Sequence, residues 1–390
     1  MSRGSRALLI LVAVVLLASV AITGAIALRG CASAPVEDQA ETATPESSPT
    51  LSQIAFISDQ PTLGAVFVMQ GDGLNWEQVS EPNQGICLYP AWSPEGDRLA
   101  YWIVEEYSRI REEIVAGVWV STVEGSEHAR INGENSGAAT FIPPVWSPDG
   151  TRVAFLSAPQ EEGSAVSVLH IAWADGSGIE QSIPLEWDLQ QLIWSPNGYE
   201  LLLVSSMFRN QGGSAYTWSF ETGEISEVHA GAEGVDLTTS GSQIVVADAR
   251  QRVVSIIGEE GELQPLVSLG VEMPVMVDIS PDNSRIAIGT TLGLTRGNLT
   301  GLYFADYLYI YELETGDLMR TVDNDGRIYF GSWSADSQGF LFYMVDYSPR
   351  PGSQLLAYAD LWNYDVESGM AEIIAETVGG FAGQGYWSPY

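Results

Sequence analysis

The sequence predicts an all-β fold, a seven-bladed β-propeller closed by pairing of strands from the two ends of the chain. Three observations predict it: a turn motif containing tryptophan that recurs along the chain, an apolar run after each copy, and a second aromatic-rich run in every repeat. Self-similarity at a spacing of roughly 40 to 55 residues is typical of repeat architectures, in which no unit buries its apolar face alone.

The turn motif consists of tryptophan, serine, proline, an acidic or amide residue, and glycine. Proline suits the second position of a turn, and glycine or asparagine tolerates the positive φ that follows. Complete copies occupy residues 92–96, 146–150 and 194–198, and weaker copies begin at Leu237, Ile279, Trp333 and Trp387. Because the copies at Leu237 and Ile279 lack tryptophan, we expect the packing between repeats to differ there.

Two kinds of apolar run indicate the strands of each repeat. One kind follows the turn motif, at residues 99–102, 153–156, 201–204, 244–247, 286–289 and 340–343. The other ends in a glycine turn, at residues 66–69, 118–120, 168–171, 216–218, 253–256, 308–311 and 361–364. Short β-branched or aromatic runs bounded by turn residues read as strands. Two hairpins per repeat give four strands, which is the build of a propeller blade.

The count of hairpins predicts how the ring closes. The second hairpin occurs seven times, whereas the first occurs six times whole and leaves one half at each end, at residues 54–57 and at Trp387. Pairing these two halves completes a seventh blade and removes the open sheet edges. Residues 51–390 are therefore predicted to form the propeller, with roughly 48 residues per blade.

In these repeats the chain resembles the TolB-like and WD-repeat-like propellers, whose unit carries an apolar residue, Trp-Ser-Pro-Asp-Gly, two spacers and a strand such as Ile-Ala-Phe. The resemblance covers nearly everything from residue 51 onward. It implies the fold and leaves the function open, because such repeats serve binding scaffolds, protein-translocation partners and gating domains of peptidases. TolB itself carries an α/β domain ahead of its propeller, whereas about 50 residues precede the first strand here.

Residues 1–31 are predicted to be a signal or membrane anchor. An apolar run of 22 residues, 7–28, follows Arg3 and Arg6, and at 1.5 Å per residue it spans about 33 Å, enough to cross a hydrocarbon core. The residues before Cys31 resemble a bacterial lipoprotein processing box, which would make Cys31 a lipidation site. Both an uncleaved anchor and a lipidated Cys31 would tether the propeller outside the cytoplasm, in the periplasm or at the cell surface of a bacterium. Residues 32–50, rich in Pro, Ser, Thr and acids, are predicted to be a disordered linker.

Charge and cysteine content exclude several classes of function. The net charge is −34, and all 16 basic residues are arginine, which argues against binding to nucleic acid or to anionic lipid surfaces. With only Cys31 and Cys87, the chain has no disulfide framework. Cys87 lies beside a motif strand and is predicted to be a buried small apolar residue.

The sequence offers no catalytic, metal or cofactor site. The three histidines, His128, His170 and His229, fall in different blades without the spacing of metal ligands, and we expect them to be structural. The chain also lacks a Gly-x-Ser-x-Gly nucleophile elbow.

The lengths of the connections indicate a binding face. In a four-stranded blade, the connection between strands two and three emerges on the same face as the link to the next blade. Residues 103–117, 291–307 and 345–360 are long connections of this kind, and 205–214 is intermediate. Because Arg and Tyr are enriched at interfaces, the candidate ligand- or partner-binding residues are Arg109, Arg111, Arg209, Arg296, Arg350, Tyr107, Phe208, Tyr303, Phe304, Tyr307 and Tyr347. By contrast, Arg98, Arg152 and Arg285 recur at one motif position, which predicts a repeated structural contact.

Two functions remain as hypotheses. The first is a non-catalytic, membrane-tethered binding or scaffold module for an envelope protein, a peptide or a cell-wall glycan. The alternative is a propeller hydrolase or lyase acting on an extracellular glycan or peptide at the mouth of the channel. The alternative requires acids or histidines that converge near the axis, and the links 81–90, 185–191 and 323–331 are where we expect them.

Overall fold

The structure is a computed structural model that describes residues 52–58, 64–81, 85–108, 113–133, 142–158, 166–205, 213–292, 305–346, 358–376 and 386–389. These residues form strands, turns and connections without any helix, which confirms the all-β prediction. In this part of the chain no helix is long and apolar enough to cross a membrane. The predicted anchor and linker, residues 1–50, lie outside the described residues.

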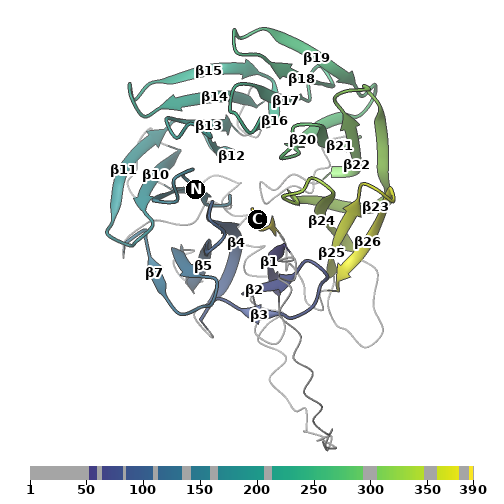
Figure 1. Cartoon of the computed structure of the whole chain (residues 1–390). Helices are drawn as coiled ribbons and strands as arrows, with labels where there is room; N and C mark the ends of the chain where they lie inside the picture. The colour runs from purple at the N-terminus through teal and green to yellow at the C-terminus, as the bar shows by residue number, and fades with distance from the viewer. Residues whose placement is uncertain are drawn as a thin grey trace, which may run out of the picture.

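The strands form antiparallel sheets that stand side by side around a central opening (Figure 1). We name the sheets A to F in chain order. Sheet A contains β27 (Tyr386–Trp387), β1 (Gln53–Ser58), β2 (Ala65–Gln70) and β3 (Glu77–Gln78). Sheet B contains β4 (Ile86–Trp92), β5 (Arg98–Ser108), β6 (Glu113–Thr122) and β7 (His128–Arg130). Sheet C contains β8 (Val145–Trp146), β9 (Arg152–Ser157), β10 (Ser167–Trp173) and β11 (Ile179–Leu185).

The remaining strands continue in the same direction around the ring. Sheet D contains β12 (Leu189–Trp194), β13 (Glu200–Ser205), β14 (Ser214–Ser219) and β15 (Ile225–Ala230). Sheet E contains β16 (Ala232–Leu237), β17 (Ile244–Asp248), β18 (Val253–Ile257) and β19 (Leu263–Ser268). Sheet F contains β20 (Met273–Ile279), β21 (Arg285–Thr291), β22 (Ala305–Glu312), β23 (Leu318–Trp333), β24 (Gly339–Asp346), β25 (Tyr358–Asp365) and β26 (Met370–Ala375).

Sheet F has seven strands because β23, with 16 residues, is long enough to belong to two groups of four strands. Its first part pairs with β22 from Leu318 onward, and its last part pairs with β24 up to Trp333. We call the strands β20 to β23 the first half of sheet F and β23 to β26 the second half. The sequence predicts a link between blades at residues 323–331. This prediction is wrong, because these residues belong to the continuous strand β23.

Each sheet runs from the centre of the ring to its outer surface. Strands β4, β12, β16, β20 and β27 lie nearest the centre in Figure 1, and β3, β7, β11, β15, β19 and β26 lie at the outside. Because neighbouring strands are antiparallel, the turn motifs all emerge at one end of the ring, which we call the turn end. The connections from the second to the third strand emerge at the other end, which we call the long-connection end.

The turn motifs are built by hydrogen bonds that their sequence supplies. The serine hydroxyl accepts from the first amide of the following strand, as in Ser93 with Arg98 at 3.0 Å and Ser147 with Arg152 at 2.9 Å. The fifth motif residue has positive φ in every described copy, including Asn283 at 57° and Ser337 at 61°, where glycine is absent. This left-handed conformation explains why glycine occupies most of these positions.

The core is divided among the contacts between neighbouring sheets. In the described residues, seven apolar clusters each lie between two neighbouring units. Four of them join sheet A to B, B to C, C to D and D to E. The other three join sheet E to the first half of F, the first half of F to the second, and the second half of F to sheet A. In the last of these, Phe56 and Phe67 of sheet A pack with Tyr343 of β24. Burial therefore continues from the C-terminal sheet to the N-terminal one.

The two ends of the described chain meet in sheet A. Strand β27 pairs with β1 through Ile54 with Trp387 and Ala55 with Tyr386. The amide of Ser388 donates to the carbonyl of Gln53 at 2.7 Å, and the amide of Gln53 donates to the Ser388 hydroxyl at 3.0 Å. The inner edge of β1 is thus covered by a strand that follows it by more than 300 residues.

Candidate functional site at the ring axis

Three of the motif tryptophans connect a sheet, or a half of sheet F, to the unit before it. The indole Nε1 of Trp146 donates to the carbonyl of Ala91 at 3.0 Å, that of Trp92 to Tyr386 at 2.9 Å, and that of Trp333 to Asp278 at 3.0 Å. Each acceptor directly precedes a motif position of the neighbouring unit: Ala91 precedes Trp92, Tyr386 precedes Trp387, and Asp278 precedes Ile279, which replaces the tryptophan. A ring of equivalent positions therefore surrounds the axis at the turn end.

The two motif copies that lack tryptophan are joined by other groups. The side chain of Gln191 donates to the carbonyl of Val235 at 2.8 Å and accepts from its amide at 3.0 Å. The carboxylate of Asp236 accepts from the amide of Ile279 at 2.7 Å and from that of Leu237 at 2.8 Å. Packing does differ at Leu237 and Ile279, as the sequence predicts, and polar side chains take the place of the indole.

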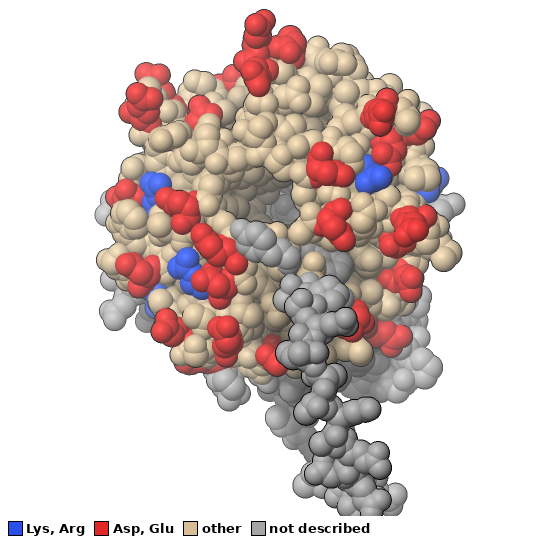
Figure 2. Space-filling view, in the orientation of Figure 1, with Lys and Arg blue, Asp and Glu red and all other residues tan. Residues whose placement is uncertain are grey.

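These substitutions bring two carboxyl groups together where sheets E and F meet. Asp236 and Asp278 occupy equivalent positions on β16 and β20, and their side chains hydrogen-bond to each other. Both residues lie on innermost strands and keep part of their surface accessible. Figure 2 shows a hollow at the centre of the ring, around which these innermost strands stand.

Burial governs the protonation of this pair. It raises the pKa of Asp236 to about 6, against the opposing effect of the amides of Ile279 and Leu237. Burial, together with the charge of Asp236, raises the pKa of Asp278 well above its ordinary value. Asp278 is therefore the member of the pair that keeps its proton as the pH rises above the ordinary pKa of aspartate, and it donates this proton in a hydrogen bond to the Asp236 carboxylate.

Two tyrosines belong to the same region. Tyr386 stands at the equivalent position in β27, and burial, with the nearby charge of Asp278, raises its pKa. Tyr89, on β4, is 6% exposed and has a positive φ of 58°, and burial raises its pKa as well. Both hydroxyls stay protonated, so this end of the axis offers hydrogen-bond donors and one shared acidic proton.

Two of the three repeated arginines, Arg98 and Arg285, make the predicted contact with the next turn motif. Arg98 donates to the carbonyl of Gly150 in the next turn motif at 2.9 Å, and Arg285 donates to the equivalent Ser337 at 3.4 Å. The guanidinium of Arg98 lies 4.9 Å from the centroid of the Trp146 ring. These bonds join the turn of sheet B to that of sheet C, and the turns of the two halves of sheet F to each other.

Most of the predicted binding residues cannot be placed. Arg109, Arg111, Arg209, Arg296, Arg350, Phe208, Tyr303, Phe304 and Tyr347 lie outside the described residues, as do Cys31 and the side chain of Tyr107. Tyr307 is described: it lies on β22, and the guanidinium of Arg320 stands 3.8 Å from the centroid of its ring. This contact within the first half of sheet F gives Tyr307 a packing role.

The histidines and Cys87 are held by contacts within the ring. His170 bonds to the hydroxyls of Ser157 and Ser182, both at 2.8 Å, and burial lowers its pKa. His229 bonds to Asp248 of the next sheet at 2.9 Å. Cys87 is 2% exposed, and burial raises the pKa of its thiol to about 11, which confirms the prediction of a buried cysteine.

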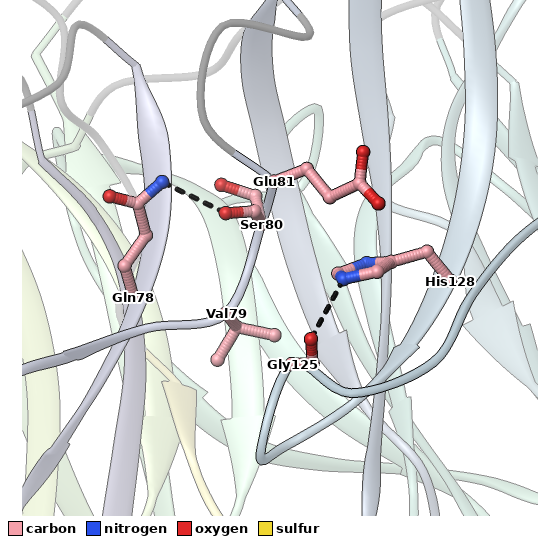
Figure 3. A pocket seen from close by; sticks show the side chains of 6 residues that line it. All are labelled: Gln78, Val79, Ser80, Glu81, Gly125 and His128. Carbon is pink, nitrogen blue, oxygen red and sulfur yellow. Dashed lines mark hydrogen bonds between the residues drawn. The ribbon is translucent and has the colours of Figure 1, made fainter.

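His128 lines a pocket of about 200 Å³ between the outer strands β3 and β7, beside Glu81 (Figure 3). Its Nε2 bonds to the carbonyl of Gly125 at 3.0 Å, and its Nδ1 to the hydroxyl of Ser121 at 2.6 Å. Nε2 must then carry the proton, so Nδ1 accepts from Ser121, which in turn accepts from Tyr101 at 2.6 Å. Since both ring nitrogens are engaged, His128 offers no ligand to this pocket.

The surface around the hollow is acidic. Aspartate and glutamate side chains are spread all around the face shown in Figure 2, whereas arginines are few. The uneven distribution follows from the net charge of −34. A partner that approaches this face by electrostatic attraction would carry positive charge.

A ring of radially arranged, four-stranded antiparallel sheets is the architecture of a β-propeller, and this chain has it. No protein-family model and no curated protein matches the chain. Among solved structures, it is similar to TolB from Acinetobacter baumannii, at 15% identity and a TM-score of 0.47 over 87% of this chain and 67% of that one. It is also similar to the putative TolB from Agrobacterium tumefaciens (15% identity, TM-score 0.45, 69% of this chain and 87% of that one). A third similar structure is a nidogen/laminin complex (10% identity, TM-score 0.44, 69% and 92%). The likeness to TolB is one of fold.

Sequence reasoning missed the carboxyl pair, although a signal for it was present. The segments Val235-Asp236-Leu237 and Val277-Asp278-Ile279 place aspartate directly before the missing tryptophan in two consecutive motif copies. The predicted acids lay in the links instead. Of the acids in these links, Glu186 is exposed and Asp188 is half-buried, and the side chains of Asp323 and Asp325 lie outside the described residues.

Proposed function

We propose that this protein is a seven-bladed propeller, closed by its two ends, that acts as a membrane-tethered, extracytoplasmic binding module without catalytic activity. Its ligand is an envelope protein, a peptide or a cell-wall glycan, held at the long-connection end. The pairing of β27 with β1 and the division of sheet F into two halves support the closure and the number of blades.

The observation that carries the binding proposal is the topology. The candidate connections all join a second to a third strand, so they belong to the same end of the ring. The connection between β5 and β6 is described in part. Strand β5 pairs with β6 from Arg98 to Ser108, whereas it pairs with β4 only as far as Val104, so this hairpin extends beyond the rest of sheet B. A rigid ring that carries variable connections at one end is a common arrangement for recognition.

The membrane tether is supported by the sequence. The apolar run at 7–28 follows two arginines, and Cys31 follows a processing box like that of a lipoprotein. A label of radioactive palmitate that is incorporated into the full chain and lost in Cys31→Ser would identify lipidation. A chain that stays in the membrane fraction without label would identify the uncleaved anchor.

The test of the binding proposal is crosslinking in native membranes, followed by identification of the captured partner. Capture should fall at least about tenfold, or 1.4 kcal/mol, when Arg109, Arg209, Arg296 and Arg350 are together replaced by alanine. Met370→Ala serves as the matched control, because Met370 follows a turn at the turn end and is 61% exposed. Capture that survives the four replacements assigns the ligand to another face.

The carboxyl pair favours one second candidate, a hydrolase or lyase at the mouth of the channel. Two carboxyl groups that share a proton supply both an acid and a base. We expect no turnover when the purified propeller is offered peptide and glycan libraries. Turnover that disappears in the Asp236→Asn, Asp278→Asn double variant would establish this alternative.

A further inference from the structure

A pocket of about 380 Å³ lies between the turn motifs of sheets C and D. Sheet C contributes Pro148, Asp149 and Arg152, and sheet D contributes Pro196, Asn197 and Tyr199. The Tyr199 side chain is 69% exposed. This pocket is at the turn end of the ring, opposite the long connections, and it is independent of the binding proposal above.

Arg152 differs here from the arginines at the equivalent position. Arg98 and Arg285 each donate to the carbonyl of the fifth residue in the next turn motif. The corresponding acceptor for Arg152 is the carbonyl of Gly198, which accepts instead from the indole of Trp194 at 3.3 Å. The turns of sheets C and D are therefore not tied by arginine.

The guanidinium of Arg152 consequently keeps unused donors. Its Nη2 lies 3.8 Å from Asp149 Oδ2 and its Nη1 lies 3.7 Å from Glu180 Oε2, both longer than a hydrogen bond. Its Nε is buried and has no hydrogen-bond partner. A buried donor without a partner is costly, and the unpaired Nε shows that the surrounding protein groups do not satisfy this guanidinium.

Aromatic rings hold this guanidinium in place. Its central carbon lies 5.3 Å from the ring centroid of Phe220, 5.5 Å from that of Trp194 and 6.0 Å from that of Trp173. Cation–π attraction to these rings stabilises the charge and limits its movement. The donors are thus positioned before any ligand binds.

The surroundings select the class of ligand. The two Nη groups of Arg152 make no hydrogen bond within the protein, and each can donate to one oxygen of a carboxylate. Asp149 and Glu180 repel a dianion such as phosphate more strongly than a singly charged carboxylate. Asp149 is fixed by the hydroxyls of Ser147 at 2.6 Å and Thr151 at 2.7 Å, so it stays beside the pocket. Pro148, Pro196 and the exposed Tyr199 provide apolar surface for the body of the ligand.

We propose that the pocket between the turns of sheets C and D binds a monocarboxylate on an apolar body, such as the C-terminal residue of a peptide. Arg152 donates to the carboxylate, and Tyr199 and the two prolines contact the apolar part.

The experiment titrates the purified full chain in detergent with N-acetyl-leucine and follows the ligand by saturation-transfer NMR. We expect saturable binding, and none of N-acetyl-leucinamide, which lacks the charge. Arg152→Lys keeps the positive charge but loses the paired N–H donors of the guanidinium, and it should weaken binding about tenfold or more. Arg98→Lys, at the equivalent position with its donor already bonded, should leave the affinity unchanged.

A second variant tests the pocket without changing the stability of the fold. Tyr199→Ala removes an exposed side chain, leaves the thermal midpoint unchanged, and should still weaken binding about threefold or more. The proposal is overturned by absence of saturable binding to the unmodified chain, by equal binding of the amide, or by full affinity in Arg152→Lys. Tighter binding of inorganic phosphate than of N-acetyl-leucine would overturn the preference for a carboxylate.

Discussion

The motif tryptophan performs two tasks through a single side chain. Its ring fills the apolar layer between two sheets, where Trp146 is 7% exposed, and its N–H reaches a carbonyl of the preceding sheet. Backbone carbonyls on the inner edge strands have no partner strand toward the axis, so the indole satisfies groups that would otherwise lack one. The repeat therefore encodes the contact between units as well as the turn.

Trp146→Phe tests this second task, because phenylalanine keeps most of the apolar volume and loses the N–H. We expect the free energy of unfolding to fall by about 1–2 kcal/mol, measured by urea denaturation. The matched variant is Trp194→Phe, whose indole bonds within its own turn to Gly198 at 3.3 Å. Equal losses in the two variants would show that the bond between sheets contributes nothing measurable.

Asp278→Asn tests the shared proton. Carboxyl groups whose pKa is raised on folding stabilise the protein below the unfolded pKa, near 4, and this stability is lost as pH rises through the folded pKa. For Asp236 the folded pKa is about 6, and for Asp278 it is raised well above the ordinary value. Stability should therefore decline from about pH 4 upward, through the Asp236 pKa of about 6 and on through the raised pKa of Asp278.

The asparagine amide can donate to Asp236 at any pH, so Asp278→Asn should flatten this decline. At pH 8 we expect a gain on the order of 2 kcal/mol, measured by thermal unfolding between pH 4 and 8. A variant with the same pH profile as the unmodified chain would disprove the shared proton. Asp282→Asn is a useful comparison, because hydrogen bonds from Ser280 and Ser284 outweigh partial burial and lower the pKa of Asp282, so its contribution is lost only at acidic pH.

At the scale of elements, the apolar pattern predicted the strands well. The runs at 99–102 and 153–156 lie inside β5 and β9, and the aromatic runs at 308–311 and 361–364 lie inside β22 and β25. A short apolar run between turn residues forms a stable strand only when it is buried, so the local sequence and the burial of the strand predict the same element. The continuous course of β23 was missed, because residues 323–326 read Asp-Asn-Asp-Gly, a turn by composition.

The carboxyl pair could not be predicted from composition alone. Acidic residues are common throughout this chain, and a count of charges does not distinguish those on the surface from those on the inner strands. Their positions become informative only when the repeats are aligned on one another, which places Asp236 and Asp278 where Ala91 and Val145 stand in other sheets. The residues of the long connections carry no repeating pattern, so their arrangement does not follow from the motif.

Removal of β27 tests the role of a single element. A chain that ends at Gly385 lacks the strand that covers β1 and the carbonyl that accepts from Trp92. We expect the thermal midpoint to fall and the protein to self-associate, since an open edge strand pairs with other chains. Light scattering and thermal unfolding measure both effects. A truncated chain that stays monomeric and keeps its midpoint would show that β27 is dispensable.

At the scale of the whole molecule, apolar clusters link every sheet to the next without a gap in the described chain, including the second half of F with A. Hydrogen bonds at the turn end follow the same path, with the indole of Trp92 joining sheet B to the last strand. Each sheet thus relies on its neighbours for burial, and stability becomes a property of the assembled sheets.

The pairing of β27 with β1 joins the two ends of the described chain, and a disulfide trap tests whether these strands are neighbours in solution. Ala55 and Tyr386 are partners in the register, so cysteines at both positions would lie within bonding reach, at a Cα separation of about 5.5 Å. In a background with Cys31→Ser and Cys87→Ala, Ala55→Cys with Tyr386→Cys should form a crosslink between these two residues. Peptide mass spectrometry should detect it in the folded chain and not in the chain in urea. Ala55→Cys with Ser240→Cys should form none. Absence of the first crosslink in a folded, oxidised chain would contradict the closed ring.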